Sequence, residues 1–222
     1  HQTLDGRRVS ISGSGNVAQF AAEKATEMGA RVITLSDSGG TLVDLDGMND
    51  ETLRALMAFK NIERGRLSDF AERRGMRFEA GRRPWHVPTD IALPCATQNE
   101  LDEHDAATLV ANGLLCVAEG ANMPSTLEAV EVFQQAGILY APGKASNAGG
   151  VAVSGLEMAQ NAQRLSWSAG EVDERLHAIM MDIHENCVRH GKRGDGSINY
   201  VTGANIAGFV KVADAMLMQG VY

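Results

Sequence analysis

A glycine turn between a short apolar strand and a helix of small residues restricts the fold of this chain more than any other feature. Val9 and Ile11 form a short buried strand, and Gly13 and Gly15 then make a tight turn. The segment 16–28 follows, with small apolar residues at helical spacing. Such a turn directs free backbone N–H groups towards the helix N-terminus, where a phosphate usually binds. A tight turn with a purely structural role is the alternative.

The glycine pattern alone is a weak signal, and its context decides the interpretation. Ala18 stands where the third glycine is expected, a replacement that the pattern allows. A strand precedes the turn, a helix follows it, and 31–36 is predicted as a second strand. We therefore predict a Rossmann-like, doubly wound, mostly parallel α/β fold. The predicted phosphate-binding residues are Gly13, Ser14, Gly15, Asn16 and Val17.

The end of the second strand bears on the choice of cofactor. Asp37 lies about 20 residues past the glycines, where an acidic group usually accepts a hydrogen bond from the adenosine ribose 2′-hydroxyl, which favours NAD. Serines beside it, and a basic cluster after a predicted helix at 49–61, can instead bind a 2′-phosphate; these residues are Ser36, Ser38, Lys60, Arg64 and Arg66. A structural role for the basic cluster is the alternative, because cations at a helix C-terminus are favoured by ~0.3–1 kcal/mol. These residues alone leave NAD and NADP equally open.

Short strands alternate with helices in the middle of the chain. Strands are predicted at 91–93, 115–118 and 139–141, with helical patterns at 105–111 and 124–135 between them. Alternation of this kind gives a parallel sheet that is covered on both faces. A polar loop follows each strand, so the three loops meet the glycine turn at one edge, which is the ligand crevice of such sheets.

These loops carry amides that can pair with a nicotinamide carboxamide or a ribose. The predicted cofactor contacts are Ala96, Thr97, Gln98, Asn122 and Asn147. Ordinary turn chemistry is the alternative, because Asn and Gly are common in turns. After Asn147 a helix is predicted at 151–164, with Ser154 near its start. A hydroxyl there suits a carboxylate, although it can equally bond its own backbone.

Two further helices are predicted towards the C-terminus. The segment 171–190 is amphipathic, whereas 204–218 is apolar nearly all round, so more than one of its faces should be covered. At about 15 residues the latter is short for a membrane span. We predict a dinucleotide-binding domain at 1–197 and a C-terminal helical segment at 198–222.

Composition excludes several classes of protein. The net charge of -8 argues against a nucleic-acid partner, and no apolar run has membrane-spanning length. Three cysteines without a Cys-x-x-Cys pair fit reduced thiols in a cytoplasm. No metal is expected: Asp44 and Asp46 resemble a calcium loop without its glutamate, and His184, Cys187 and His190 have no second set of ligands. The chain begins at His1, which indicates a fragment of a longer protein.

Several motifs together carry a resemblance to a known family. They are Ser12–Gln19, Leu93–Leu101, Ala118–Pro124, Asn147–Val151 and Ala204–Phe209. Essentially all 222 residues resemble the coenzyme domain and C-terminal helix of bacterial, hexameric, NADP-specific glutamate dehydrogenases. The sequence Ser36-Asp37-Ser38 is typical of the NADP-specific members. The resemblance therefore favours NADP over NAD, with Ser38, Lys60 and Arg66 as 2′-phosphate contacts.

The resemblance also implies an activity and a division of labour. The family converts L-glutamate and NADP reversibly into 2-oxoglutarate, ammonium and NADPH, in a cytoplasmic homo-hexamer that serves nitrogen assimilation. Its catalytic lysine and aspartate belong to an N-terminal domain, so no catalytic residue is expected here. Thr97, Asn122 and Asn147 match positions near the nicotinamide, and Ser154, with Val151, matches the substrate site. The last helix is expected to pack on the missing domain.

Three alternatives remain open at this point. Leucine, valine and phenylalanine dehydrogenases share the fold and chemistry, but an apolar residue is expected there at the position of Ser154. A methyltransferase also has a Gly-x-Gly turn and an acidic residue after its second strand, but it does not need the three amide-bearing loops. A nucleotide sensor without catalytic activity is a third class.

Overall fold

The computed structural model describes residues 3–220, which form two compact units. The first unit extends to Tyr140 and the second begins at Ala141. The predicted domain boundary after residue 197 lies inside the second unit, and a functional division at that point stays a prediction.

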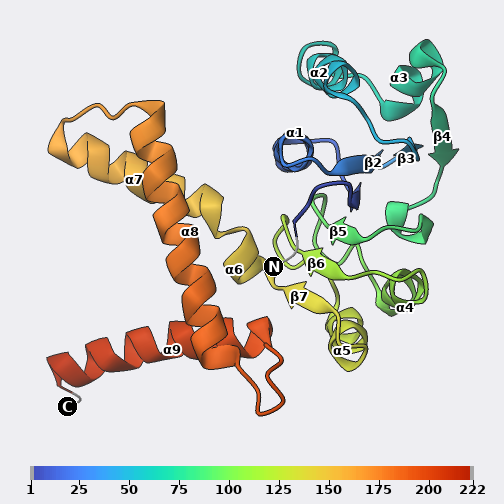
Figure 1. The fold of residues 1–222 in the computed structure, drawn as a ribbon. Coiled ribbons are helices and arrows are strands. Elements are labelled where there is room, and N and C mark those ends of the chain that lie inside the picture. Colours follow the sequence, from blue (N-terminus) through green and yellow to red (C-terminus); the bar gives the residue numbers. More distant parts are fainter. Residues whose placement is uncertain (1–2, 221–222) are drawn as a thin grey trace. The chain divides into compact units, whose positions relative to one another are not determined.

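A seven-stranded sheet forms the centre of the first unit (Figure 1). Its strands are β1 (Arg8–Ile11), β2 (Arg31–Asp37), β3 (Gly40–Val43), β4 (Arg77–Ala80), β5 (Ile91–Leu93), β6 (Cys116–Ala118) and β7 (Leu139–Ala141). They lie in the order β4-β3-β2-β1-β5-β6-β7. β1 pairs in parallel with β2 and β5, and β5 with β6, whereas β3 pairs antiparallel with both β2 and β4. The predicted mostly parallel α/β fold is confirmed.

From β1 the chain first adds β2, β3 and β4 on one side and then β5, β6 and β7 on the other. Folds of this kind bind their ligands at the point beside β1 where the strand order reverses. The crossover through α1 (Asn16–Glu27) leads from β1 to β2, and that through α4 (Glu103–Ala111) leads from β5 to β6. Because crossovers are right-handed, α1 covers one face, while α4 and α5 (Leu127–Gln135) cover the other (Figure 1). Ala18, at the third glycine position, is fully buried in the core with Val9 and Ile11.

The remaining elements of this unit extend the sheet beyond β2. The predicted helix 49–61 is α2 (Asp50–Ala58) followed by a π-helical turn at Phe59–Glu63, and α3 spans Leu67–Arg74. The sequence analysis did not predict β4, because the alternation of polar and apolar residues at 77–80 is only four residues long. β4 forms by pairing with β3, where Gly40 has a φ of 149° and leaves no room for a side chain beside Glu79.

Side-chain caps set helix bounds that periodicity had placed a few residues away. Asp102 and Asp105 form a capping box, so α4 starts at Glu103 rather than 105. The Thr126 hydroxyl accepts from the Ala129 N–H, so α5 starts at Leu127 rather than at 124. In both helices the cap satisfies backbone donors that have no partner inside the helix.

The second unit is helical. It comprises α6 (Gly143–Ser146), α7 (Ala148–Gln163), α8 (Ala169–Gly191) and α9 (Tyr200–Gln219). The Asn199 side chain caps α9, which therefore has 20 residues and not about 15, so the predicted length was wrong. At that length, and with a mean hydropathy of 1.2, α9 is the one helix within 3–220 that is long and apolar enough to span a membrane. A core helix meets the same criteria.

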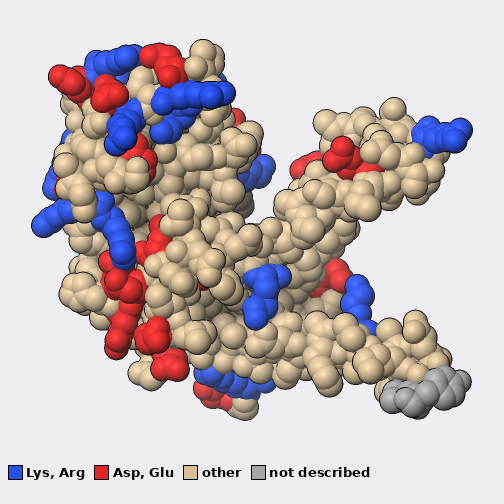
Figure 2. All heavy atoms as spheres, turned by 180° about the vertical axis from the view of Figure 1, so that it is seen from behind, with Lys and Arg blue, Asp and Glu red and all other residues tan. Residues whose placement is uncertain are grey.

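Large apolar side chains on α9 are exposed in the described chain. Gly203 is its one buried residue within 3–220, and the exposed apolar residues are Ile206, Phe209, Val212, Met216, Leu217 and Met218. Figure 2 shows scattered charged groups on the second unit, with tan surface between them. The sequence predicts that more than one face of this helix is covered. Within the described chain, α8 covers only part of α9.

α8 and α9 approach each other closely at glycines. A Cβ atom at Gly203 would overlap the carbonyl group of Cys187, and one at Gly191 would overlap the carbonyl oxygen of Asn199. The two helices therefore touch backbone to backbone, which any larger residue at these positions would prevent.

Replacing Gly203 by alanine should separate α8 from α9 and destabilise the chain. Overpacking of this kind costs roughly 1–3 kcal/mol. At Gly208, on the same helix, an added Cβ atom would meet nothing within 4 Å in the described chain, so Gly208→Ala should stabilise the chain by about 0.5–1 kcal/mol through helix propensity. Denaturant unfolding of both variants measures the difference. Equal effects of the two substitutions would contradict the close helix contact.

Candidate functional site

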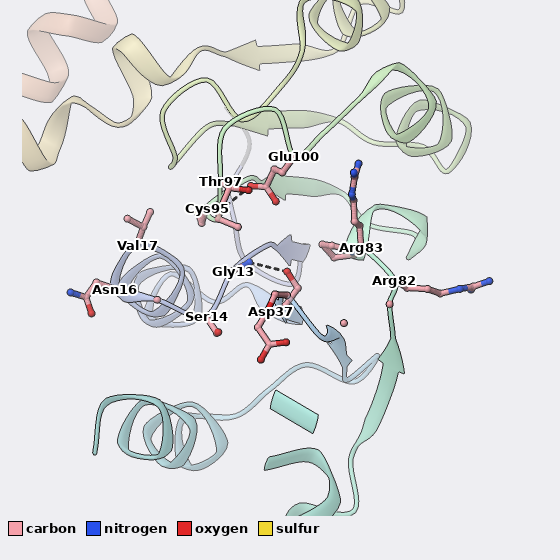
Figure 3. A pocket seen from close by; sticks show the side chains of 17 residues that line it. Gly13, Ser14, Asn16, Val17, Asp37, Arg82, Arg83, Cys95, Thr97 and Glu100 are labelled. Carbon is pink, nitrogen blue, oxygen red and sulfur yellow. Dashed lines mark hydrogen bonds between the residues drawn. The ribbon is translucent and has the colours of Figure 1, made fainter. Parts of the chain in front are cut away.

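One cavity of about 700 Å³ lies at the carboxyl ends of β1, β2 and β5, a volume typical of cofactor sites (Figure 3). Most of the cofactor residues predicted in the first unit line it: Gly13, Ser14, Gly15, Asn16, Val17, Ser36, Asp37, Ser38, Ala96 and Thr97. The loop between β4 and β5 completes the wall with Gly81, Arg82, Arg83 and Pro84, which the sequence did not indicate.

The glycine turn lies directly against the loop that follows β5. Gly13 has a φ of 84°, and a Cβ atom there would lie 3.0 Å from the Cys95 carbonyl oxygen and 3.2 Å from Cα of Ala96. Side chains rarely adopt this φ, so both the conformation and the space require glycine.

Ser36 supports this turn from β2. The Gly13 N–H donates to the Ser36 hydroxyl oxygen at 2.9 Å, and the Ser36 N–H donates to the Gly13 carbonyl at 3.1 Å. Ser36 is buried, whereas Ser38 is exposed at the cavity. Ser36 therefore has a structural task in the turn, and its predicted contact with a 2′-phosphate stays a prediction.

The N-terminus of α1 faces this cavity without a side-chain cap from the described residues. Gly15 is the N-cap residue, and no acidic residue lies in the first turn. Unsatisfied N–H groups and the helix dipole together attract an anion. Gln19, which the sequence analysis did not single out, donates to the Ser14 carbonyl at 2.8 Å and exchanges hydrogen bonds with Asn61.

Asp37 already accepts hydrogen bonds from the backbone. The Gly39 N–H donates to Oδ1 at 2.8 Å and the Leu67 N–H donates to Oδ2 at 2.9 Å. Lys60 Nζ lies 3.9 Å from Oδ2 and donates to the Gly65 carbonyl at 2.9 Å. Each oxygen of Asp37 thus already accepts one backbone hydrogen bond, and the carboxylate holds the 60–67 segment in place. Neither Lys60 nor Arg66 is among the residues that line the cavity.

Glu100 forms the wall on the other side of the glycine turn. Its Oε1 accepts hydrogen bonds from the Ser12 hydroxyl at 2.8 Å and from the Ala96 N–H at 3.0 Å. The Cys95 N–H in turn donates to the Ser12 hydroxyl oxygen at 2.9 Å. Burial raises the pKa of the Glu100 carboxyl, against hydrogen bonds from Ser12, Ala96 and Thr97 that lower it. Burial also raises the pKa of Cys95 to about 12, so this thiol stays protonated.

A buried carboxylate, that of Glu119, organises the loop after β6. The Tyr140 hydroxyl donates to Glu119 at 2.5 Å, and the Ser125 N–H donates to it at 3.3 Å. A Cβ atom at Gly120 would lie 2.6 Å from Cys95 Sγ, which shows that this loop touches the one after β5. Gln98 and Asn122 are exposed and outside the cavity lining, so their contacts with a cofactor stay predictions.

The other predicted site residues belong to the second unit. The backbone of Asn147 ends α6, and its N–H donates to the Gly143 carbonyl at 2.9 Å. Val151 and Ser154 are exposed on α7, and the Ser154 hydroxyl donates to the Gly150 carbonyl at 3.3 Å. That bond fits the alternative in which the Ser154 hydroxyl bonds its own helix backbone. The substrate contacts of Ser154 and Val151 stay predictions. Within 3–220, no three His, Cys, Asp or Glu side chains gather as a metal site.

Ionisation of Glu100 should oppose folding, because burial raises its pKa in the folded chain. A folded state that binds this proton more tightly loses stability as pH rises through the pKa. Glutamine cannot ionise, so the melting temperature of Glu100→Gln minus that of the parent should grow as the pH rises from about 4 to 7. Thermal unfolding across that range measures the difference. A difference that stays constant or shrinks with pH would contradict a raised pKa.

Comparison with known proteins agrees with this geometry. NADP-specific glutamate dehydrogenase of Escherichia coli is 64% identical over 218 residues, which are 98% of this chain and 48% of that protein. NAD(P)-specific glutamate dehydrogenase of Xylanibacter ruminicola is 56% identical over 221 residues, 100% of this chain and 50% of that protein. The chain spans about half the length of the curated relatives it matches.

A solved structure and a family model extend this similarity. The crystal structure of Plasmodium falciparum glutamate dehydrogenase matches with a TM-score of 0.93 and 41% identity, over 97% of this chain and 47% of that one. The model of the glutamate/leucine/phenylalanine/valine dehydrogenases matches residues 1–220. With the glycine turn and the cavity at the switch point of its sheet, the chain belongs to the glutamate/leucine/phenylalanine/valine dehydrogenase family.

Proposed function

We propose that this chain is the coenzyme-binding part of an NADP-dependent glutamate dehydrogenase. The observation that carries the proposal is the cavity around Gly13, where the turn, the uncapped N-terminus of α1 and the end of β2 meet. Relatives that are 56% and 64% identical carry the name glutamate dehydrogenase. The activity is the reversible oxidative deamination of L-glutamate to 2-oxoglutarate and ammonium.

The residues present fit a dinucleotide. The absence of a side chain at Gly13 lets the loop after β5 lie against the turn, and the first turn of α1 offers backbone donors for a diphosphate. Ser38 is exposed at the end of β2, where the adenosine ribose lies in such folds. The bound cofactor would accept a hydride from the substrate, while the chain binds it, orients it and excludes water from one of its faces.

NADP is the better candidate than NAD for this site. Both oxygens of Asp37 accept backbone hydrogen bonds, which leaves less capacity for a ribose 2′-hydroxyl. Lys60 lies beside that carboxylate, and Arg66 is exposed in the same segment, so both can reach a 2′-phosphate by side-chain rearrangement. NAD stays the alternative, since one relative is named NAD(P)-specific.

The complete enzyme would divide its tasks between two halves. In this chain Thr97, Gln98, Asn122 and Asn147 would contact the nicotinamide half, and Ser154 with Val151 would contact the substrate. Among the described residues, the cavity lining includes Glu100 and two arginines but no base that a second group orients towards a substrate. We propose that the catalytic residues lie in the half of the protein outside this chain. A homo-hexamer in the cytoplasm, with α9 covered by that half, completes the proposal.

Removing the cations near Asp37 should weaken NADPH binding and leave NADH binding little changed. Charge-assisted hydrogen bonds to the 2′-phosphate are worth about 1.5–3 kcal/mol each, so Lys60→Ala with Arg66→Ala should together lower NADPH affinity by roughly a hundredfold or more. Isothermal titration calorimetry with both cofactors measures this. Arg54→Ala, an exposed arginine on α2 outside the cavity, is the matched control. Equal losses for NADPH and NADH would contradict the assignment.

The chain by itself should bind NADPH without turning over. A spectrophotometric assay at about 340 nm, the absorbance of reduced nicotinamide, with NADPH, ammonium and 2-oxoglutarate tests turnover beside the binding titration. S-adenosylmethionine in the same titration tests the methyltransferase alternative. Measurable turnover would place the catalytic groups within these residues. Absence of any dinucleotide binding would overturn the proposed function itself.

A further inference from the structure

We infer that Glu100 is a positioning residue for the nicotinamide end of the cofactor, because one carboxylate oxygen joins the two turns that form the cavity. The inference rests on the proposed dinucleotide function. Glu100 does not itself need to touch the reacting atoms for this role, since it acts through the backbone of residues 95–97.

Glu100 and Ser12 together accept the hydrogen bonds of the turn after β5. Oε1 accepts from the Ser12 hydroxyl and from the Ala96 N–H, at 2.8 and 3.0 Å. The Ser12 hydroxyl oxygen accepts from the Cys95 N–H at 2.9 Å, and the Thr97 N–H also donates to Glu100. The carboxylate therefore receives, directly or through Ser12, the N–H groups of three successive residues. Figure 3 shows Glu100 beside Thr97, above the glycine turn.

The two turns depend on Glu100 to different extents. The glycine turn is also held by the pair of hydrogen bonds between Gly13 and Ser36, and by Gln19, which donates to the Ser14 carbonyl. For residues 95–97, the N–H groups bond to Glu100 or to Ser12, which Glu100 orients. Removal of the carboxylate should therefore loosen the turn after β5 first.

The position of the second turn tells which part of the cofactor it serves. In this fold the adenosine lies at the end of β2 and the diphosphate at the turn after β1. The second mononucleotide must then extend over the end of β5, on the other side of β1 in the sheet. Ala96 and Thr97 line the cavity at that end. Precise placement of the nicotinamide matters, because hydride transfer requires a short approach of the reacting atoms.

Two ligands and two substitutions test the inference. NADPH contains the nicotinamide, whereas 2′-phospho-ADP-ribose lacks it and keeps the rest. Glu100→Ala should lower the affinity for NADPH by about tenfold or more, and that for 2′-phospho-ADP-ribose by less than about threefold. Glu100→Gln keeps an oxygen that can accept from Ser12 and Ala96, so it should stay within about threefold of the parent for both ligands.

Controls separate this role from loss of charge or of folding. Glu103→Ala removes an exposed carboxylate in the first turn of α4, outside the cavity lining, and should change neither affinity. Circular dichroism checks the fold of each variant. If Glu100→Ala does not fold, Ser12→Ala decides, because it removes one donor to Glu100 and should lower NADPH affinity selectively.

Three results would overturn the inference. Equal losses for both ligands in Glu100→Ala would indicate general damage to the cavity. A Glu100→Gln variant as weak as Glu100→Ala would assign the effect to charge and not to the accepted hydrogen bonds. An unchanged NADPH affinity in Glu100→Ala would leave the turn independent of Glu100. Failure of the parent chain to bind NADPH would instead refute the proposed function.

Discussion

The contact between the glycine turn and the end of β5 is the constraint on which the rest of the site depends. Gly13 approaches Cys95 and Ala96 so closely that a methyl group would require the backbone to move. This approach sets the distance between the loops on either side of the switch point. It also aims the N-terminus of α1 into the cavity, because the helix begins just after its Gly15 cap.

Loops at this edge have backbone donors that the sheet cannot satisfy, and buried or half-buried side chains accept hydrogen bonds from them. Ser36 accepts from the glycine turn, Asp37 from the segments after β2 and before α3, and Glu100 from the loop after β5. Glu119 does the same for the loop after β6. Because an unsatisfied buried polar group is costly, these bonds fix loop conformations as firmly as apolar packing fixes the sheet.

The same bonds change how the polar residues of the cavity should be interpreted. A carboxylate after the second strand suggests a ribose ligand, yet each oxygen of Asp37 already accepts one backbone hydrogen bond, and Oδ2 lies close to Lys60. The N-terminus of α1 and the Ser38 side chain remain accessible at the cavity, and Lys60 and Arg66 lie in the adjacent 60–67 segment. An anionic ligand with an additional phosphate suits that combination better than one without it.

Local sequence determined the strand, glycine turn and helix within residues 8–27, the alternation of strands with helices, and thus the parallel sheet. Backbone conformation at a glycine and apolar periodicity are properties of neighbouring residues, so they can be deduced without knowing the fold. The edge strand β4 could not be deduced, because 77–80 is a strand only through its pairing with β3.

The hydrogen-bond partners at the site were decided by tertiary structure alone. Ser12 and Glu100 are separated by 88 positions in the chain, and Asp37 and Leu67 by 30. Which donor meets which acceptor depends on the order of the strands and on the path of each loop, and neither is encoded in residue spacing. The sequence by itself therefore determined which residues reach the sheet edge. Packing decided which of them support the loops and which remain accessible to a ligand, because only burial shows which backbone donors need a partner.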